Sequence, residues 1–148
     1  MAGQFTLDLR RFAARAGGNA RLVIKKVVID VGTSIVLKTP VGDPDTWSMP
    51  APAGYVGGRA RGSWQYGRGT ATGGEPGGVD PTGAGPLGRI SAGVQGGDAA
   101  DVHFITSDVP YMRPLEYEGH SRQAPEGMVR KTIAEYQQFV AQAVRGLR

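Results

Sequence analysis

The sequence predicts an α+β fold, with a small antiparallel sheet packed against a long N-terminal helix and a long C-terminal helix, joined by long Pro- and Gly-rich loops. Three observations support this prediction. Apolar residues repeat every three or four positions near both ends of the chain, short alternating runs lie between them, and glycine makes up 24 of the 148 residues. We divide the chain into an N-terminal arm, residues 1–18, and a single domain, residues 19–148.

The first helix is expected over residues 19–38. Apolar residues at positions 20, 24, 27, 31 and 35 follow helical spacing, and Asn19 suits an N-cap. The many β-branched residues at 27–36 leave a strand possible, but the length and the period of about 3.6 favour a helix. Four prolines then predict a loop over residues 39–58, because proline interrupts both helices and sheet ladders.

The middle of the chain is expected to supply the strands. Ala60, Trp64 and Tyr66 are spaced for one face of a strand over residues 60–66, and a second strand is expected at 101–107. Between them, residues 67–97 contain 12 glycines. Such a stretch loses much chain entropy on ordering, so we predict a mobile loop inserted into the domain, with at most a weak strand at 87–94.

The last third of the chain predicts a second long helix. Residues 110–117 fit a turn or a short helix, and residues 119–125 a loop. From 125 to 145 apolar residues repeat at intervals of three and four. Pro125 suits a first helical turn, and acidic residues near the start and basic residues near the end match the helix dipole.

Composition excludes several kinds of protein. There is no cysteine, so disulfides, thiolate metal sites and cysteine nucleophiles are excluded. No segment approaches the roughly 20 apolar residues of a membrane span, and the N-terminus lacks the apolar region of a signal peptide. We expect a soluble protein made in a reducing cytosol. The net charge of +4 tolerates a polyanion nearby without requiring one.

Motifs that would indicate an enzyme are weak. Gly83-Ala-Gly85-Pro-Leu-Gly88 matches G-x-G-x-x-G, but it lacks the preceding strand that a dinucleotide site needs. His103 and His120 lack metal-ligand spacing. The carboxylate pairs at 43/45 and 116/118 are interpreted as turn or salt-bridge groups, and no serine lies in a G-x-S-x-G sequence. We predict no cofactor, no metal and no enzymatic activity.

A basic run near the N-terminus allows two interpretations. It contacts a nucleic-acid backbone or an acidic partner, or it is simply a solvated arm and helix face. The first interpretation makes the chain a small nucleic-acid-binding module, although no nucleic-acid-binding signature is present. The run consists of Arg10, Arg11, Arg15, Arg21, Lys25 and Lys26.

Two stretches carry a resemblance to a known family. One runs from Thr39-Pro-Val-Gly42 through a proline-rich loop to Gly57-Gly-Arg59-Ala-Arg-Gly-Ser63-Trp64-Gln65. The other joins Ile105-Thr-Ser-Asp-Val-Pro110-Tyr111, Pro114-Leu115-Glu116-Tyr117 and Ser121-Arg-Gln123-Ala124-Pro125-Glu-Gly127-Met128-Val129. In this order they resemble the tail-completion, or minor tail and neck, proteins of long-tailed double-stranded DNA bacteriophages.

The resemblance covers about residues 20–145 but not the whole of that range. Residues 43–55 lengthen the loop after the T-P-V motif, Glu118 separates Leu-Glu-Tyr from Gly119, and the glycine-rich stretch 67–97 has no counterpart. No role is therefore transferred to residues 67–97. The motif residues are Thr39, Pro40, Val41, Arg59, Arg61, Ser63, Trp64, Pro110, Tyr111, Leu115, Glu116, Tyr117, Gln123, Ala124, Pro125, Gly127 and Met128.

The resemblance implies a structural virion protein of the phage neck or tail, made in the host bacterial cytoplasm. Copies would form a ring, expected to be a hexamer, which completes the tail and joins it to the head-side connector. Its neighbours would be neck, tail-terminator and tail-tube proteins, with packaged DNA passing through the lumen and contacted without sequence specificity. A tail terminator and a head-closure protein are the alternatives within this class. The motif residues are expected to determine fold and assembly, and residues 1–18, 40–57 and 67–97 are the expected interfaces.

Overall fold

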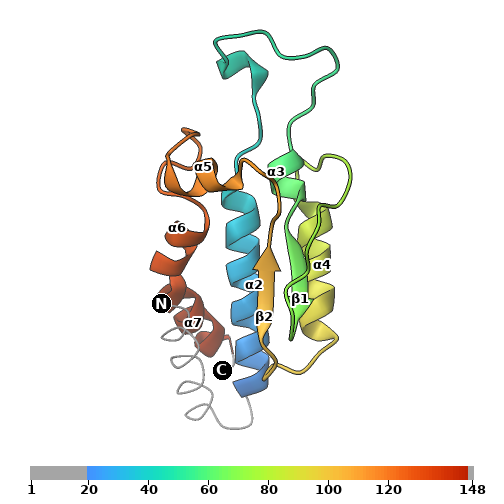
Figure 1. Cartoon of the computed structure of the whole chain (residues 1–148). Coiled ribbons are helices and arrows are strands. Elements are labelled where there is room, and N and C mark those ends of the chain that lie inside the picture. The colour runs from blue at the N-terminus through green and yellow to red at the C-terminus, as the bar shows by residue number, and fades with distance from the viewer. Residues whose placement is uncertain (1–19, 147–148) are drawn as a thin grey trace.

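The computed structural model describes residues 20–146. It is an α+β structure, as predicted, with helices around one small antiparallel sheet (Figure 1). The N-terminal arm, with Arg10, Arg11 and Arg15, lies outside the described residues, and so does Asn19. The elements in chain order are α2 (Ala20–Lys38), the 3-10 helix η2 (Pro44–Thr46), α3 (Arg59–Gly62), β1 (Gln65–Arg68), α4 (Ala84–Gln95), β2 (His103–Thr106), α5 (Met112–Tyr117), α6 (Val129–Ala134) and α7 (Tyr136–Arg145).

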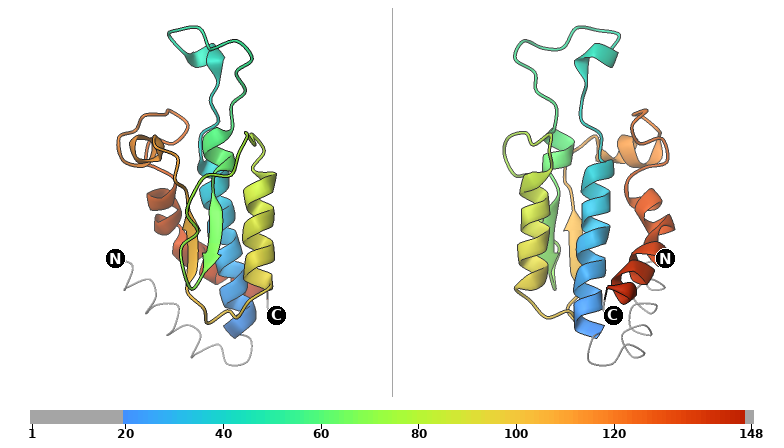
Figure 2. Two further views of the ribbon diagram at one scale, coloured as in Figure 1. Left: turned by 45° about the vertical axis from the view of Figure 1, so that its right-hand side comes forward. Right: turned by 180° about the vertical axis from the view of Figure 1, so that it is seen from behind.

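Helix α2 is the centre of the fold, and the helix expected at 19–38 is confirmed over its described part. It lies between α4 on one side and α6 and α7 on the other, with the sheet across a third face (Figures 1 and 2). Because neighbours surround it, its buried residues extend beyond a single stripe. They are Ala20, Val23, Val27, Val28, Val31, Gly32, Ile35 and Val36.

The sheet consists of β1 and β2 paired antiparallel, with Gln65 opposite Thr106 and Arg68 opposite His103. The prediction that the first strand begins at residue 60 is wrong, because residues 59–62 form the short helix α3. Gly58, at φ 117°, turns the chain into this helix, a conformation that favours glycine. Side chains of α3 then bond to neighbouring loops instead of to a partner strand.

The loop predicted over 67–97 is wrong for residues 84–95, which form a helix, and the weak strand expected at 87–94 is absent there, whereas residues 69–83 form no helix or strand. Helix α4 occupies 84–95 and buries Pro86, Ile90 and Val94 at intervals of four residues. A Cβ on Gly32 of α2 would lie 3.0 Å from two side-chain carbons of Ile90. The absence of a side chain there lets α4 approach α2 closely, and the apolar burial offsets the entropy cost of the glycines.

Residues 70–74 lie beside the sheet, held by polar contacts from both strands. The Gln65 amide donates to the carbonyls of Gly73 and Gly74 at 3.1 and 2.7 Å. The Thr106 hydroxyl donates to the carbonyl of Thr72 at 2.7 Å. The first part of the glycine-rich stretch therefore covers the sheet.

The single C-terminal helix expected over 125–145 is wrong in two respects. Helical structure begins at Val129, and it is divided at Glu135 into α6 and α7. Glu135 keeps φ −94° and ψ 0°, and its carboxylate accepts a hydrogen bond from Lys38 of α2 at 2.9 Å. The turn or short helix expected at 110–117 is present as α5.

Candidate interaction site

Three motif residues meet at the C-terminal end of α2. The Thr39 hydroxyl donates to the carbonyl of Ile35 at 2.7 Å and accepts from the indole N–H of Trp64 at 2.8 Å. The Arg61 guanidinium donates to the Thr39 carbonyl at 3.0 Å and to the carbonyls of Leu37 and Pro81. Thr39 and Trp64 are buried, so these bonds join α2, α3 and the start of β1 into one polar junction inside the core.

A second contact fixes the loop that follows α2. The Gln123 side chain donates to the backbone carbonyl of Val41 at 2.8 Å and accepts from the backbone N–H of Val41 at 3.1 Å. This two-point contact imitates one step of a sheet ladder. It holds the first residues of the proline-rich loop, including the buried Pro40, against the segment that leads to Ala124.

The third motif contact starts the C-terminal helices. The buried Glu116 carboxylate accepts hydrogen bonds from the backbone N–H groups of Met128, Val129 and Arg130, at 2.7–2.9 Å. These are free N–H groups of the first turn of α6, where a negative charge is favourable. A Cβ on Gly127, at φ 82°, would lie 2.6 Å from the Glu116 carbonyl oxygen, which explains the glycine before Met128.

Other motif residues lie apart from these contacts. Ser63 is buried, and its hydroxyl pairs with that of Ser107 at 2.6 Å. Arg59 is exposed and forms a two-point ion pair with Glu75, at 2.6 and 2.9 Å, which lowers the pKa of the Glu75 carboxyl. The Arg59 guanidinium also lies 5.5 Å from the ring centroid of Tyr111. Leu115 and Ala124 are buried, whereas Pro110 and Pro125 are exposed.

The projecting loop, residues 40–57, is one of the segments that were expected to form an interface. It extends beyond the rest of the described chain at the end where α2 finishes (Figure 1). Trp47 and Tyr55 face each other across it, with ring centroids 4.8 Å apart. Met49 is 74% exposed, and Trp47, Tyr55 and Val56 are exposed as well. A cluster of large exposed apolar residues is typical of a protein-binding surface.

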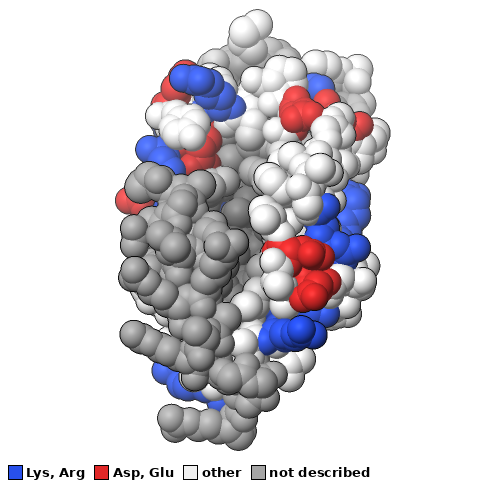
Figure 3. Space-filling model, turned by 60° about the horizontal axis from the view of Figure 1, so that its bottom comes forward, with Lys and Arg blue, Asp and Glu red and all other residues white. Residues whose placement is uncertain are grey.

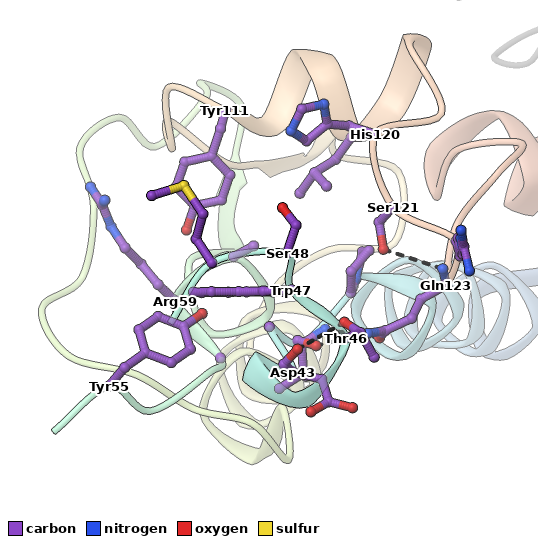
Figure 4. Close-up of a pocket in the computed structure, with 18 residues that line it drawn as sticks. Asp43, Thr46, Trp47, Ser48, Tyr55, Arg59, Tyr111, His120, Ser121 and Gln123 are labelled. Atoms are coloured by element: carbon purple, nitrogen blue, oxygen red, sulfur yellow. Dashed lines mark hydrogen bonds between the residues drawn. The ribbon is translucent and has the colours of Figure 1, made fainter. Parts of the chain in front are cut away.

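A first hollow of about 720 Å³ lies between the projecting loop and α5 with the segment after it (Figure 4). Its walls include Trp47, Tyr55, Arg59, Tyr111 and His120. Ser48, Ser121 and Asp43 also line it, but within the described residues no hydrogen bond connects His120 to any of the three. The hollow therefore presents aromatic and polar surface, without an assembled nucleophile and base.

A second hollow of about 320 Å³ lies on the other face of α5. Trp64, Met112 and Val129 contribute apolar surface, with Arg113 and Tyr117 beside them. The guanidiniums of Arg113 and Arg130 lie 5.9 and 5.2 Å from the Tyr117 ring centroid. Tyr117 is 63% exposed, so this cation–π cluster faces solvent.

The basic residues of α2 that could contact a polyanion are engaged locally. Lys26 pairs with Asp30 at 2.8 Å, and Lys25 donates to the carbonyl of Gln95 at 3.1 Å. The pKa of Asp98 is lowered, first by the Ala100 N–H and then by the nearby charge of Arg21. Among the described residues visible in Figure 3, acidic side chains lie between basic ones.

Residues 20–146 contain no cluster of three or more metal-ligating side chains. His103 accepts from or donates to the Tyr66 hydroxyl at 2.7 Å and bonds to the Ala99 carbonyl at 3.2 Å, so both ring nitrogens are occupied. No helix within the same residues has the length and apolarity needed to cross a bilayer.

Comparison of the chain with protein-family models, curated proteins and solved structures finds no match.

Proposed function

We propose that the chain is a structural virion protein of a long-tailed double-stranded DNA bacteriophage, acting at the neck or tail. Several copies form a ring that completes the tail and joins it to the head-side connector. Packaged DNA passes through the lumen, and neck, tail-terminator and tail-tube proteins are the neighbours. The chain acts through its surfaces and not through a reaction.

The observation that carries the proposal is the connection between the motifs of the resemblance. The T-P-V segment bonds to the R-x-R-x-S-W segment through Thr39 and Trp64, and to the Q-A-P segment through Gln123. The L-E-Y segment bonds to the G-M-V segment through Glu116. Residues that are remote in the sequence thus form one bonded framework, as expected if the resemblance reflects a shared fold.

The projecting loop gives independent support for an assembly role. An isolated monomer gains nothing from exposing Trp47, Met49, Tyr55 and Val56 on an extended loop, because apolar surface is more stable when covered. A neighbouring subunit supplies such a cover. The loop was also expected to be an interface from the resemblance.

The test is cryo-electron microscopy of the particles produced by cells that carry this gene, combined with mass spectrometry of the purified particles. We expect the chain in the particles and a ring between head and tail whose subunit fits α2, the sheet and the projecting loop. A ring directly above the last tail-tube layer or directly below the connector distinguishes a tail terminator from a head-closure protein. Absence of the chain from purified particles would overturn the proposal.

The alternative of a small nucleic-acid-binding module predicts a different result. The purified chain would then bind DNA or RNA with an affinity that falls steeply as salt rises. The local engagement of Lys25 and Lys26 does not favour this alternative. Salt-sensitive binding by the free chain, together with its absence from particles, would replace the structural proposal.

A further inference from the structure

We propose that β2 of one copy pairs edge to edge with β2 of a second copy, antiparallel, so that two free chains form a dimer. The two sheets then make one continuous sheet in the order β1, β2, β2, β1. The inference concerns the chain before it meets other proteins. It therefore goes beyond the virion role proposed above and does not depend on it.

The two edges of the sheet differ in what lies against them. The outer side of β1 is in use, because the Thr72 hydroxyl donates to the backbone carbonyl of Tyr66 at 3.0 Å and α4 packs against this strand. Strand β2 pairs with β1 alone and lies on the side of the sheet away from α4 (Figure 2). The edge that is available to another strand is thus the outer edge of β2.

The register of the ladder shows which groups of β2 face outward. The N–H of Gly69 donates to the carbonyl of Val102 at 2.8 Å, which continues the register of β1 and β2. Bonded and non-bonded pairs alternate along an antiparallel ladder. His103 and Ile105 therefore belong to non-bonded pairs and turn their backbone N–H and C=O groups away from β1. Within the described residues, no hydrogen bond reaches those groups.

The side chains of this edge do not oppose pairing. Residues 102–107 contain no lysine, arginine, aspartate, glutamate or proline, and these are the residues that commonly prevent edge-to-edge contact. The nearest carboxylates, Asp101 and Asp108, lie outside the strand. Asp101 forms an ion pair with Arg68 at 3.4 Å, and Asp108 accepts the N–H of Gly74. An approaching strand therefore meets neutral residues along the whole of β2.

A second β2 matches the outward groups of the first. When Phe104 lies opposite the partner's Phe104, His103 of each copy lies opposite Ile105 of the other. Both outward residues of each strand are then in bonded pairs, and each such pair exchanges two N–H···O bonds. The pattern is its own complement under a two-fold rotation, so the contact is isologous.

The dimer has a role in the free protein. An open strand edge pairs with any other exposed strand, and covering it prevents such contacts. Ring contacts are heterologous, whereas this contact is isologous. The dimer is therefore not a step of the ring, and it accounts for how the free chain keeps its sheet edge covered before assembly.

Disulfide cross-linking tests the register, because the natural chain contains no cysteine. The Cα atoms of a non-bonded antiparallel pair lie about 4.5 Å apart, within the range of about 4.4–6.8 Å that a disulfide spans. The full-length Phe104→Cys variant should therefore form a linked dimer on oxidation. Thr106→Cys, on the same face, is the matched control, because its two thiols would lie about 13 Å apart across the axis.

Dimer yields are measured on non-reducing gels. We expect roughly tenfold more dimer from Phe104→Cys than from Thr106→Cys, because pairing raises the effective concentration of the thiols. A mixture of Val102→Cys and Thr106→Cys should also give mixed dimer in excess of either homodimer, since the register places these positions opposite each other. Equal yields from Phe104→Cys and Thr106→Cys would overturn the inference.

A proline substitution gives a second readout. The N–H of His103 points away from β1, so His103→Pro removes an outward donor and leaves the ladder bonds in place. His103→Ala is the matched control, because it loses the same side-chain bonds to Tyr66 and Ala99 but keeps the N–H. In analytical ultracentrifugation we expect His103→Ala to dimerise like the natural chain and His103→Pro to sediment as a monomer, with urea unfolding showing that both are folded.

Two sedimentation results would overturn the inference: a natural chain that stays monomeric at high concentration, or a His103→Pro variant that dimerises as well as His103→Ala. If His103→Pro does not fold, the ratio of cross-linked dimers decides. Neither measurement depends on whether the chain is found in phage particles, so the dimer and the virion role fail separately.

Discussion

The indole N–H of Trp64 donates to the hydroxyl oxygen of Thr39 at 2.8 Å, inside the core. The same hydroxyl donates its proton to the carbonyl of Ile35, one helical turn earlier. One oxygen atom thus gives the Ile35 carbonyl a second hydrogen bond, beside the one from the Thr39 backbone N–H, and satisfies the only polar group of Trp64, a side chain that is 4% exposed. This relay ties Thr39, the residue after α2, to Trp64, the residue before β1.

Replacing Thr39 by valine should destabilise the protein. Valine has nearly the same shape but leaves the buried indole N–H unpaired, which costs about 1–3 kcal/mol of unfolding free energy. Urea denaturation followed by tryptophan fluorescence measures the change. Thr39→Ser keeps the hydroxyl and is the matched control, expected to lose less. Equal stability of the valine and serine variants would show that the relay contributes nothing.

Replacing Glu116 by glutamine should weaken the start of α6. The variant keeps the size of the side chain but loses the charge that accepts three backbone N–H groups, and hydrogen bonds to charged groups contribute about 1.5–3 kcal/mol. Thermal and urea unfolding measure the loss. Glu118→Gln removes an exposed carboxylate two residues away and should change stability by less than about 0.5 kcal/mol. A comparable loss in both variants would contradict the capping role.

Two glycines of α4 should respond in opposite directions to alanine. A Cβ on Gly93 would lie 2.2 and 2.3 Å from ring carbons of Tyr66, whereas a Cβ on Gly88 would meet nothing within 4 Å. Gly88→Ala should stabilise the protein by about 0.4–1 kcal/mol by restricting the unfolded chain. Gly93→Ala should destabilise it by about 1–3 kcal/mol through overpacking. The comparison uses urea midpoints of the two variants, and equal shifts would contradict the close packing of α4 on β1.

Asp80 should make stability depend on acid pH. Its pKa is lowered, first by the N–H of Gly85 and then by the Thr82 hydroxyl. Because the folded pKa lies below the unfolded value, the contribution is present above the unfolded pKa and is lost as pH falls through the folded pKa. Asp80→Asn should therefore be less stable than the natural chain at pH 7, with the difference shrinking towards pH 3. Unfolding free energies at both pH values check this, and a difference independent of pH would contradict it.

Sequence reasoning succeeded where local patterns and tertiary structure agree. Helix α2 was predicted correctly because its apolar residues repeat with helical spacing over enough residues to form a helix. Packing against its neighbours only makes its buried surface wider than one stripe. The small antiparallel sheet was predicted from two short runs in which apolar and polar residues alternate. The strand start at residue 60 was wrong because Arg61 bonds to the carbonyls of Leu37 and Thr39 at the end of α2 and of Pro81. No local sequence pattern predicts those partners.

The glycine-rich stretch failed for a different reason. The many glycines do raise the entropy cost of ordering this stretch. Pro86, Ile90 and Val94, however, are spaced four residues apart, as on one face of a helix. Gly93 also lies against the ring of Tyr66, where a Cβ would clash. The helical spacing was visible in the sequence, but the prediction gave more weight to the glycine content. The division of the C-terminal helices at Glu135 had no comparable signal, since neither proline nor glycine lies there.

The candidate site was only partly accessible from the sequence. The motif residues were named, but their pairing through Thr39, Gln123 and Glu116 required the fold. The two hollows depend on α5 lying between the projecting loop and α6, an arrangement that no local pattern encodes. Trp47 and Met49 became candidate interface residues because the structure exposes them. Exposure is a property of the folded chain and is not encoded in a local pattern.

The central position of α2 has a consequence for how the chain folds. This helix precedes nearly all its partners, and its contacts with α6 and α7 come from residues about a hundred positions later. During synthesis the part of its valine-rich surface that α6 and α7 cover stays exposed until those helices leave the ribosome. Such an exposed apolar segment is prone to aggregation. The protein thus depends on α6 and α7 to cover one side of α2, and translation halted before α7 would release a chain in which part of that side stays exposed.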